Sequence, residues 1–221
     1  MQKLVIIFTL LLSFAMGKIS SPAANRDVLA RQNVQAELGK HFGKPVFIRI
    51  IKNEYLLELW LKETNGKWSL FRNYNIAAMS GKLGPKTAEG DMQAPEGFYR
   101  VYKSSMNPRS NYHLSFNIGY PNSYDRKLGR TGSFIMIHGD IVSVGCFAMT
   151  NSRIEEIYTL VDEAFKAGAA YVPVQVYPFR MTDERMQKEA GNKHINFWQH
   201  LLPGWQYTET NKAPYPDKDN E

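Results

Sequence analysis

Two residues that could perform chemistry together lie close to one another in the sequence. Cys146 is the only cysteine of the chain, and His138 precedes it by eight residues in the stretch FIMIHGDIVSVGCFAMTN. A cysteine attacks as its thiolate, and a neighbouring imidazole can generate the thiolate by accepting the proton. Gly145 leaves the backbone before the cysteine unshielded, so amides there could face a developing oxyanion. This pattern is typical of a cysteine nucleophile with a histidine base.

The alternative is a structural thiol. Free cysteine is among the residues most often buried in protein cores, and the stretch around Cys146 is largely apolar. Periodicity alone does not show that His138 and Cys146 touch. Histidine before cysteine is the reverse of the papain-type order, so that cysteine-peptidase fold is disfavoured. From the residues alone, both interpretations of Cys146 stay open.

Composition narrows the other functional classes. A single cysteine allows no intramolecular disulfide, and His194 and His200 are six residues apart, unlike the i,i+4 pair of a helical zinc site. We therefore expect no metal and no organic cofactor. The formal charge of +6 suits either simple solubility or an anionic partner such as a cell-wall polymer. No basic stripe with interleaved aromatic residues predicts nucleic-acid binding.

The N-terminus predicts export. Residues 1–17, MQKLVIIFTLLLSFAMG, combine an early lysine, an apolar run and small residues near the end, as in a secretory signal peptide. A retained anchor is the alternative, but the apolar run is short of the roughly 20 residues that span a bilayer. We therefore expect a secreted protein, periplasmic or associated with the cell wall, without stable membrane insertion after cleavage.

The elements that must position the pair follow from periodicity. Residues 18–44 are expected to form a helical segment that ends its helix at Gly39. Asn65-Gly66 predicts a hairpin turn. Runs of branched and aromatic residues predict strands at 46–52, 54–62, 67–76, 98–103 and 112–118, with long loops at 80–97 and 119–133. The expected core is mainly β.

The segments around and after the pair complete the prediction. FIMIH and IVSVG read as two antiparallel strands joined at Gly139-Asp140. A helix should follow, started by a capping box of Ser152 and Glu155.

Residues 171–178 predict an edge strand, because Pro173 lacks a backbone donor. Two further helices are expected at 182–190 and 194–202, the second ending before Pro203, and a mobile tail at 211–221. The predicted fold class is α+β, a mainly β core with helices added at both ends.

Several separate motifs then point to a known family. HG at His138 followed by SVGC ending at Cys146 resembles the signature of the L,D-transpeptidase catalytic domain, also called YkuD: His-Gly, then Ser-His-Gly-Cys and an Arg. The fuller text resembles the YafK-like branch. The segments that carry this resemblance are KLGPKTAEGDMQAPEGFYRV (82–101), SFNIGYPNSYDRKLGRTGSFIMIHGD (115–140), VSVGCFAMT (142–150) and YPFRMTDERM (177–186). Together they cover roughly residues 45–190.

The resemblance implies a fold and roles for the residues. It implies a YkuD-like β-sandwich catalytic domain at 45–190, with a C-terminal helix at 191–210 packed on it. Cys146 would be the nucleophile, His138 the general base, and Gly139 the backbone partner of the imidazole. The amides of Gly145 and Cys146 would help to bind the oxyanion, and Ser143 would support the site.

The resemblance also implies an activity. Such a domain attacks an amide of a peptidoglycan stem peptide through the cysteine, and an amine resolves the resulting thioester, which makes the enzyme a transpeptidase. A hydrolase of the same fold, which cleaves stem peptides or releases a wall-attached protein, is the first alternative. A non-catalytic wall-binding protein is the second.

Two positions depart from the family signature. Val144 stands where the family has a histidine, and Ala148 where it has an arginine. Arg130 is our preferred replacement for the missing cation. The residues expected to border the substrate cleft are therefore Arg130, Tyr120, Lys82 and Lys86, each of which could equally belong to an ordinary loop.

Overall fold

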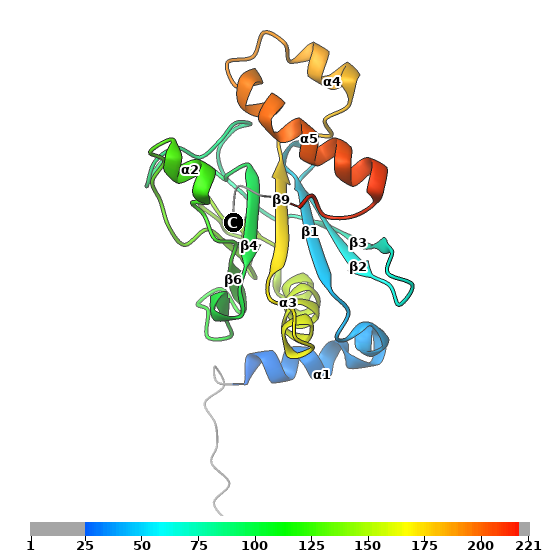
Figure 1. Ribbon diagram of the computed structural model, residues 1–221. Coiled ribbons are helices and arrows are strands. Elements are labelled where there is room, and N and C mark those ends of the chain that lie inside the picture. The colour runs from blue at the N-terminus through cyan, green and yellow to red at the C-terminus, as the bar shows by residue number, and fades with distance from the viewer. Residues whose placement is uncertain (1–24, 217–221) are drawn as a thin grey trace, which may run out of the picture.

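Figure 1 shows the computed structural model, which describes residues 25–216. The predicted signal peptide at 1–17 and the last five residues of the predicted tail lie outside this range. The described chain folds into two β-sheets with five α-helices, which confirms the predicted α+β class. None of the helices within 25–216 combines the length and the apolar character that crossing a membrane requires.

The larger sheet has the strand order β3-β2-β1-β9-β4. Its strands are β1 (Val46–Ile51), β2 (Leu56–Lys62), β3 (Trp68–Asn75), β4 (Gly97–Val101) and β9 (Val172–Tyr177). The predicted hairpin turn joins β2 to β3, and Gly66 there adopts a φ of 82°, a left-handed conformation that glycine takes without steric cost. The strands predicted from branched and aromatic residues are thus confirmed in this sheet.

Strand β9 is central, so the prediction of an edge strand at 171–178 is wrong. It runs parallel to β1 on one side and antiparallel to β4 on the other. The ladder to β1 begins only at Val174, so Pro173 lies before its first pair and does not interrupt it. Pro173 pairs with Arg100 of β4 but lies outside the ladder to β1, so it is compatible with a strand that has a neighbour on each side.

The smaller sheet has the order β5-β6-β7-β8, with β5 (Met106–Asn107), β6 (Ser115–Asn117), β7 (Met136–His138) and β8 (Phe147–Ala148). Strands β7 and β8 are parallel, so the predicted antiparallel hairpin is wrong. The IVSVG segment is a loop whose Ile141 and Val144 side chains are 65% and 68% exposed. These apolar residues cover no core, which is why their pattern misled the strand prediction.

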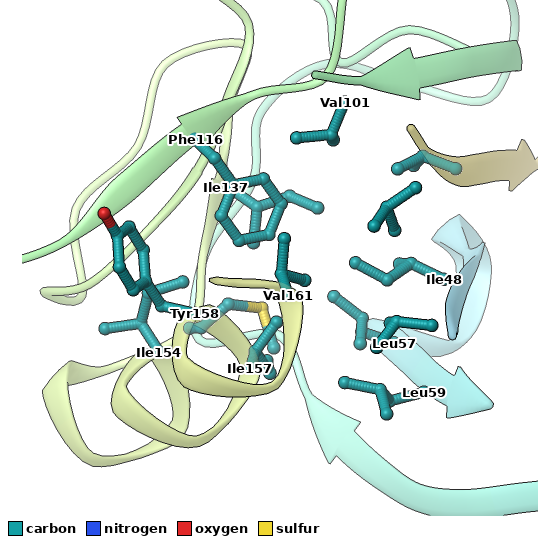
Figure 2. Packing of buried hydrophobic residues seen from close by; sticks show 14 of the residues in the cluster. Ile48, Leu57, Leu59, Val101, Phe116, Ile137, Ile154, Ile157, Tyr158 and Val161 are labelled. Carbon is teal, nitrogen blue, oxygen red and sulfur yellow. The ribbon is translucent and has the colours of Figure 1, made fainter. Parts of the chain in front are cut away.

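Helix α3 (Asn151–Lys166) connects the two sheets. Figure 2 shows Ile157 and Val161 of this helix between Ile137 of the smaller sheet and Ile48 and Leu57 of the larger one. All five side chains are almost completely buried. The smaller sheet, which carries the candidate site, is therefore held by a continuous apolar core rather than by its few strand hydrogen bonds.

The start of α3 differs from the predicted capping box. The residue before the helix is Thr150, at a φ of 73°, and its side chain makes no capping bond. Ser152 already lies within the first turn. The carboxylate of Glu155 instead contacts residues from two other segments, His113 at 2.8 Å and Asn33 at 3.0 Å. These contacts between distant segments compete with the local motif.

The remaining helices lie at the two ends of the larger sheet (Figure 1). Helix α1 (Arg26–Leu38) packs on α3, while α4 (Asp183–Lys188) and α5 (Ile195–Asn211) lie at the opposite end. A short helix, α2 (Ser123–Lys127), occupies the second predicted loop. Three 3₁₀ turns complete the elements: η1 (Gly39–His41), η2 (Lys52–Glu54) and η3 (Lys103–Ser105).

Helix α5 continues through Pro203, so the predicted end at residue 202 is wrong. Pro203 is on the exposed side, whereas Trp198 and Trp205 are buried against the domain. Packing of this face outweighs the hydrogen bond that the proline removes. Beyond the helix, the ring of Tyr215 lies 5.4 Å from that of Phe98, so the described part of the predicted mobile tail is anchored.

Candidate active site

His138 and Cys146 come from neighbouring segments of the smaller sheet. In the parallel β7–β8 pair, Ile137 lies opposite Phe147, and both side chains are fully buried in the core. Because strand side chains alternate between faces, the residues flanking this pair point to the other face. His138 on β7 and Cys146 at the approach to β8 therefore share that face, and both line one cavity.

The cavity has a volume of about 400 Å³ and opens to solvent. Ser115 of β6 contributes to its polar lining, and four exposed apolar or aromatic side chains surround its mouth: Tyr112, Phe134, Val142 and Val144. The Tyr112 ring lies 4.8 Å from the imidazole of His138. A concave, mostly apolar site of this size with a few polar groups is typical of a ligand-binding pocket.

The imidazole of His138 has a defined tautomer. Its Nδ1 lies 2.6 Å from the carbonyl oxygen of Gly139, and a carbonyl can only accept a hydrogen bond. The proton therefore resides on Nδ1, which leaves the lone pair on Nε2. Burial lowers the pKa of His138, although the Gly139 carbonyl and Asp140 partly oppose this effect. The ring is thus a neutral base near neutral pH.

The thiol of Cys146 is half-buried and bound by backbone groups. It accepts a hydrogen bond from the Met136 N–H at 3.3 Å and donates to the Phe134 carbonyl at 3.6 Å. Burial raises the pKa of the thiol, while the Met136 N–H and the charge of Lys86 act in the opposite direction. Within the part of the chain that the structure describes, these backbone groups rather than the His138 ring are the partners of the sulfur.

The glycine before the cysteine is held by a residue that the sequence did not single out. Gly145 has a φ of 77°, and its N–H donates to Ser80 Oγ at 2.7 Å. The Gly145 amide was expected to bind the oxyanion together with the Cys146 amide. In this conformation the Gly145 N–H is instead hydrogen-bonded to Ser80 Oγ. Ser143 Oγ is buried at the cavity wall without a hydrogen-bond partner among the described residues.

All four residues expected at the cleft lie outside the lining of this cavity. Arg130 binds Asp125 at 2.7 Å, and its guanidinium lies 4.6 Å from the centre of the Phe197 ring. Tyr120 is buried in the core, where its hydroxyl donates to the Lys86 or Thr131 carbonyl. The structure therefore does not bring Arg130 to the thiol as a substitute for the missing family cation.

The two lysines of the glycine-rich loop differ from each other. Lys82 is exposed and borders a separate groove of about 810 Å³. Lys86 is buried, with its Nζ 2.6 Å from Asp91 Oδ1 and 2.8 Å from the Ala88 carbonyl. Lys86 therefore acts on Cys146 only through its charge, at a distance.

The loop that carries these lysines is built around a buried ion pair, Lys52 with Glu96. Lys52 Nζ binds Glu96 Oε1 at 2.9 Å and the carbonyls of Lys82, Gly84 and Ala94. Glu96 also accepts from the Gly84 N–H and from Trp198 Nε1. Sequence reasoning missed Lys52, and its only signal is a lysine that ends an apolar strand.

Comparisons with known proteins show the family of this chain. Residues 45–176 match the model of the family described as YkuD, L,D-transpeptidase catalytic domain. The chain belongs to this family. It is 41% identical over 218 residues, 97% of this chain and 86% of the relative, to the Escherichia coli K12 protein named "Putative L,D-transpeptidase YafK", and equally so to the protein of that name from strain O157:H7.

A solved structure shows the same fold. The helical cell shape determining protein Pgp2 (K307A mutant) from Campylobacter jejuni superimposes with a TM-score of 0.50 at 21% identity, covering 84% of this chain and 67% of that one. At this identity the likeness concerns the fold alone.

The two departures from the family signature lie in different surroundings. Val144 is exposed at the cavity mouth, where a histidine would add a polar group to the lining. Ala148 is fully buried, and its backbone exchanges hydrogen bonds with Ala78 and Ala77. The site of this chain is therefore less polar than the family signature implies.

Proposed function

We propose that this protein is an exported, cysteine-dependent transpeptidase that acts on peptidoglycan stem peptides through a thioester at Cys146. Family membership supports the class of reaction, because L,D-transpeptidases act on these stem peptides. The observation that carries the proposal is the placement of His138 and Cys146 on one face of the β7–β8 pair, in one cavity. The apolar N-terminal stretch supports export to the periplasm or cell wall.

His138 is the base of the proposed first step. Its Nδ1–H stays on the Gly139 carbonyl, so Nε2 accepts the thiol proton of Cys146 within the cavity that both residues line. Both groups are neutral at rest, because burial lowers the pKa of the imidazole and raises that of the thiol. Proton transfer therefore accompanies the attack rather than preceding it as a stable ion pair.

The sulfur then forms a bond to the carbonyl carbon of the stem-peptide amide. The negative charge that develops on the carbonyl oxygen is met by the Cys146 amide, since the Gly145 amide is bonded to Ser80. The imidazolium returns its proton to the leaving amine as the carbon–nitrogen bond breaks. The products of this half-reaction are a thioester on Cys146, a free amine and a neutral His138.

In the second half-reaction, the amine of another stem peptide attacks the thioester. His138 takes its proton and passes it to the departing sulfur, which restores the thiol. Water in place of the amine would make the enzyme a hydrolase, including one that releases a wall-attached protein. The two outcomes share every residue named above and differ only in the molecule that resolves the thioester.

The test is incubation of the purified protein with peptidoglycan sacculi that carry attached protein, followed by analysis of the muropeptides and of released protein. New crosslinks are expected, whereas trimmed stems or released protein would replace the transpeptidase proposal with the hydrolase. Cys146→Ala and His138→Gln should abolish the reaction. His41→Gln, a histidine in η1 outside the cavity lining, is the matched control and should retain it. Full activity of Cys146→Ala would overturn the mechanism.

A further inference from the structure

A single hydroxyl connects the glycine-rich loop to the peptide that precedes Cys146. Ser80 Oγ accepts the Gly145 N–H at 2.7 Å and donates its own proton to the Met92 carbonyl at 2.5 Å. The first bond joins segments 65 residues apart, and the second lies within the glycine-rich loop. Ser80 therefore holds the backbone next to the thiol, although its own side chain does not line the cavity.

The backbone around Ser80 is fixed on both sides. The Ser80 carbonyl accepts from the Ala94 N–H at 3.1 Å, which closes the glycine-rich loop on itself. Two residues earlier, Ala78 forms a β-bridge with Ala148 beside the start of α3. The hydroxyl is thus presented to Gly145 from a segment that is hydrogen-bonded both to the loop and to β8. Its position is determined by these contacts and not by the local sequence.

The conformation of Gly145 decides where the nucleophile points. With a φ of 77°, Gly145 is in the left-handed region, and its backbone sets the direction of the Cys146 N–H and of the Cys146 side chain. A hydrogen bond to the Gly145 amide holds this turn in place. A Cβ at Gly145 would lie 3.6 Å from the Gln93 carbonyl, so neighbouring atoms do not by themselves lock the glycine.

We propose that Ser80 is a positioning residue for the acylation of Cys146. Its hydroxyl holds the Gly145 peptide so that the thiol and the Cys146 amide approach the same carbonyl group of the substrate, the sulfur at carbon and the amide at oxygen. This inference rests on the proposed thioester chemistry and extends it to a residue outside the His-Cys motif. Ser80 touches neither substrate nor thiol, so its effect should fall on the steps that need this alignment and not on the intrinsic reactivity of the sulfur.

The test compares two reactions of Cys146 in the full-length mature protein. Alkylation by iodoacetamide needs only an accessible thiolate, whereas ring opening of a carbapenem to a thioester needs the oxyanion to be stabilised. Ser80→Ala is expected to slow carbapenem acylation, followed by intact mass, by roughly 10- to 100-fold. It should leave the alkylation rate and its pH dependence within about twofold of those of the unmodified protein. Ser80→Thr, which keeps the hydroxyl, should recover most of the acylation rate.

Ser69→Ala is the matched control, because it removes a serine hydroxyl that binds Glu63 at 2.9 Å on strand β3. It should change neither rate. Equal loss of alkylation and acylation in Ser80→Ala, or no loss of acylation, would overturn the positioning role. A crystal structure of Ser80→Ala gives a readout without catalysis: Gly145 is expected to leave its left-handed conformation, and an unchanged Gly145 would also contradict the proposal.

The outcomes separate this inference from the proposed function. Failure of the unmodified protein to form a thioester with either the carbapenem or a tetrapeptide muropeptide would overturn the thioester chemistry and the inference with it. Acylation of the unmodified protein and of Ser80→Ala at the same rate would overturn the role of Ser80 alone.

Discussion

The Nδ1 of His138 lies 2.6 Å from the carbonyl oxygen of Gly139, the next residue in the chain. This contact requires Gly139 to approach other backbone closely. A Cβ there would lie 2.7 Å from the Tyr112 carbonyl and 2.8 Å from Asn151 Oδ1. The absence of a side chain at residue 139 thus permits the carbonyl to sit where it selects the tautomer of the base.

Gly139→Ala is therefore expected to lower the rate of thioester formation. The new methyl group would clash with the Tyr112 carbonyl and the Asn151 side chain, so the backbone at residue 139 must shift. The carbonyl of residue 139 then moves away from His138 Nδ1, and the imidazole loses its orientation. We expect a rate loss of at least about 10-fold, with a loss of unfolding free energy of about 1–3 kcal/mol from overpacking. Gly191→Ala is the control, since its Cβ meets nothing within 4 Å. Acylation kinetics and urea unfolding of both variants measure the effect, and an unaltered rate in Gly139→Ala would contradict it.

The pH dependence of the two reacting groups gives a second prediction. Because burial raises the pKa of Cys146 above that of a model thiol, its alkylation rate should keep rising with pH through and beyond the ordinary thiol range. Because burial lowers the pKa of His138, the imidazole should remain an active base at lower pH than an ordinary histidine. The decline of the acylation rate on the acid side should therefore have its midpoint below pH 6.5, the ordinary pKa of imidazole. Rates measured across pH 5 to 10 test both statements. A plateau of alkylation near neutral pH would instead indicate a thiolate–imidazolium pair.

The buried Lys52–Glu96 pair should make a large contribution to stability. Burial lowers the pKa of Lys52, and Glu96 opposes that effect, so the pair depends on both partners. Lys52→Met leaves the Glu96 carboxylate buried without a cation, and the unfolding free energy should fall by about 3–5 kcal/mol. Adding Glu96→Gln should recover part of this loss. Lys188→Met, which breaks an exposed pair with Glu184, should cost only about 0.5 kcal/mol or less in the same urea titrations.

Asp91 gives a stability effect with a defined pH window. Burial raises the pKa of this carboxyl, but hydrogen bonds from Lys86 and from the amides of Thr87, Ala88 and Gln93 outweigh burial and lower the pKa to about 2 from 3.8. A depressed folded-state pKa adds stability that is complete above 3.8 and is lost as the pH falls towards 2.

Asp91 is partly accessible to solvent, so screening reduces the effect, and Asp91→Asn should lower the unfolding free energy by about 1 kcal/mol at pH 7. The difference from the unmodified protein should be the same at pH 5 and should shrink below pH 4. Urea titrations at each pH measure it. A difference that disappears already between pH 7 and 5 would show that the carboxylate is not held in this way.

Much of the fold was predictable because local patterns and tertiary packing agree there. Runs of branched and aromatic residues form strands β1, β2 and β3, and the Asn65-Gly66 turn joins β2 to β3 in the expected hairpin. The prediction failed where long-range contacts outweigh local preference. Pro173 lies in a central strand because the β1 ladder starts after it, and α5 passes Pro203 because two tryptophans bury its inner face.

The sequence by itself determined the reactive residue types and their order, because the single cysteine and the preceding His-Gly are local features. It also determined the family, because several separate motifs can be recognised without the structure. Only the tertiary structure decided how these residues are arranged. In the tertiary structure β7 and β8 are parallel, and the Ser80 hydroxyl accepts a hydrogen bond from the Gly145 amide. Arg130 binds Asp125 and does not reach the thiol. These relationships depend on contacts between segments far apart in the chain, and the local spacing of residues carries no information about which distant backbone will supply a hydrogen-bond partner.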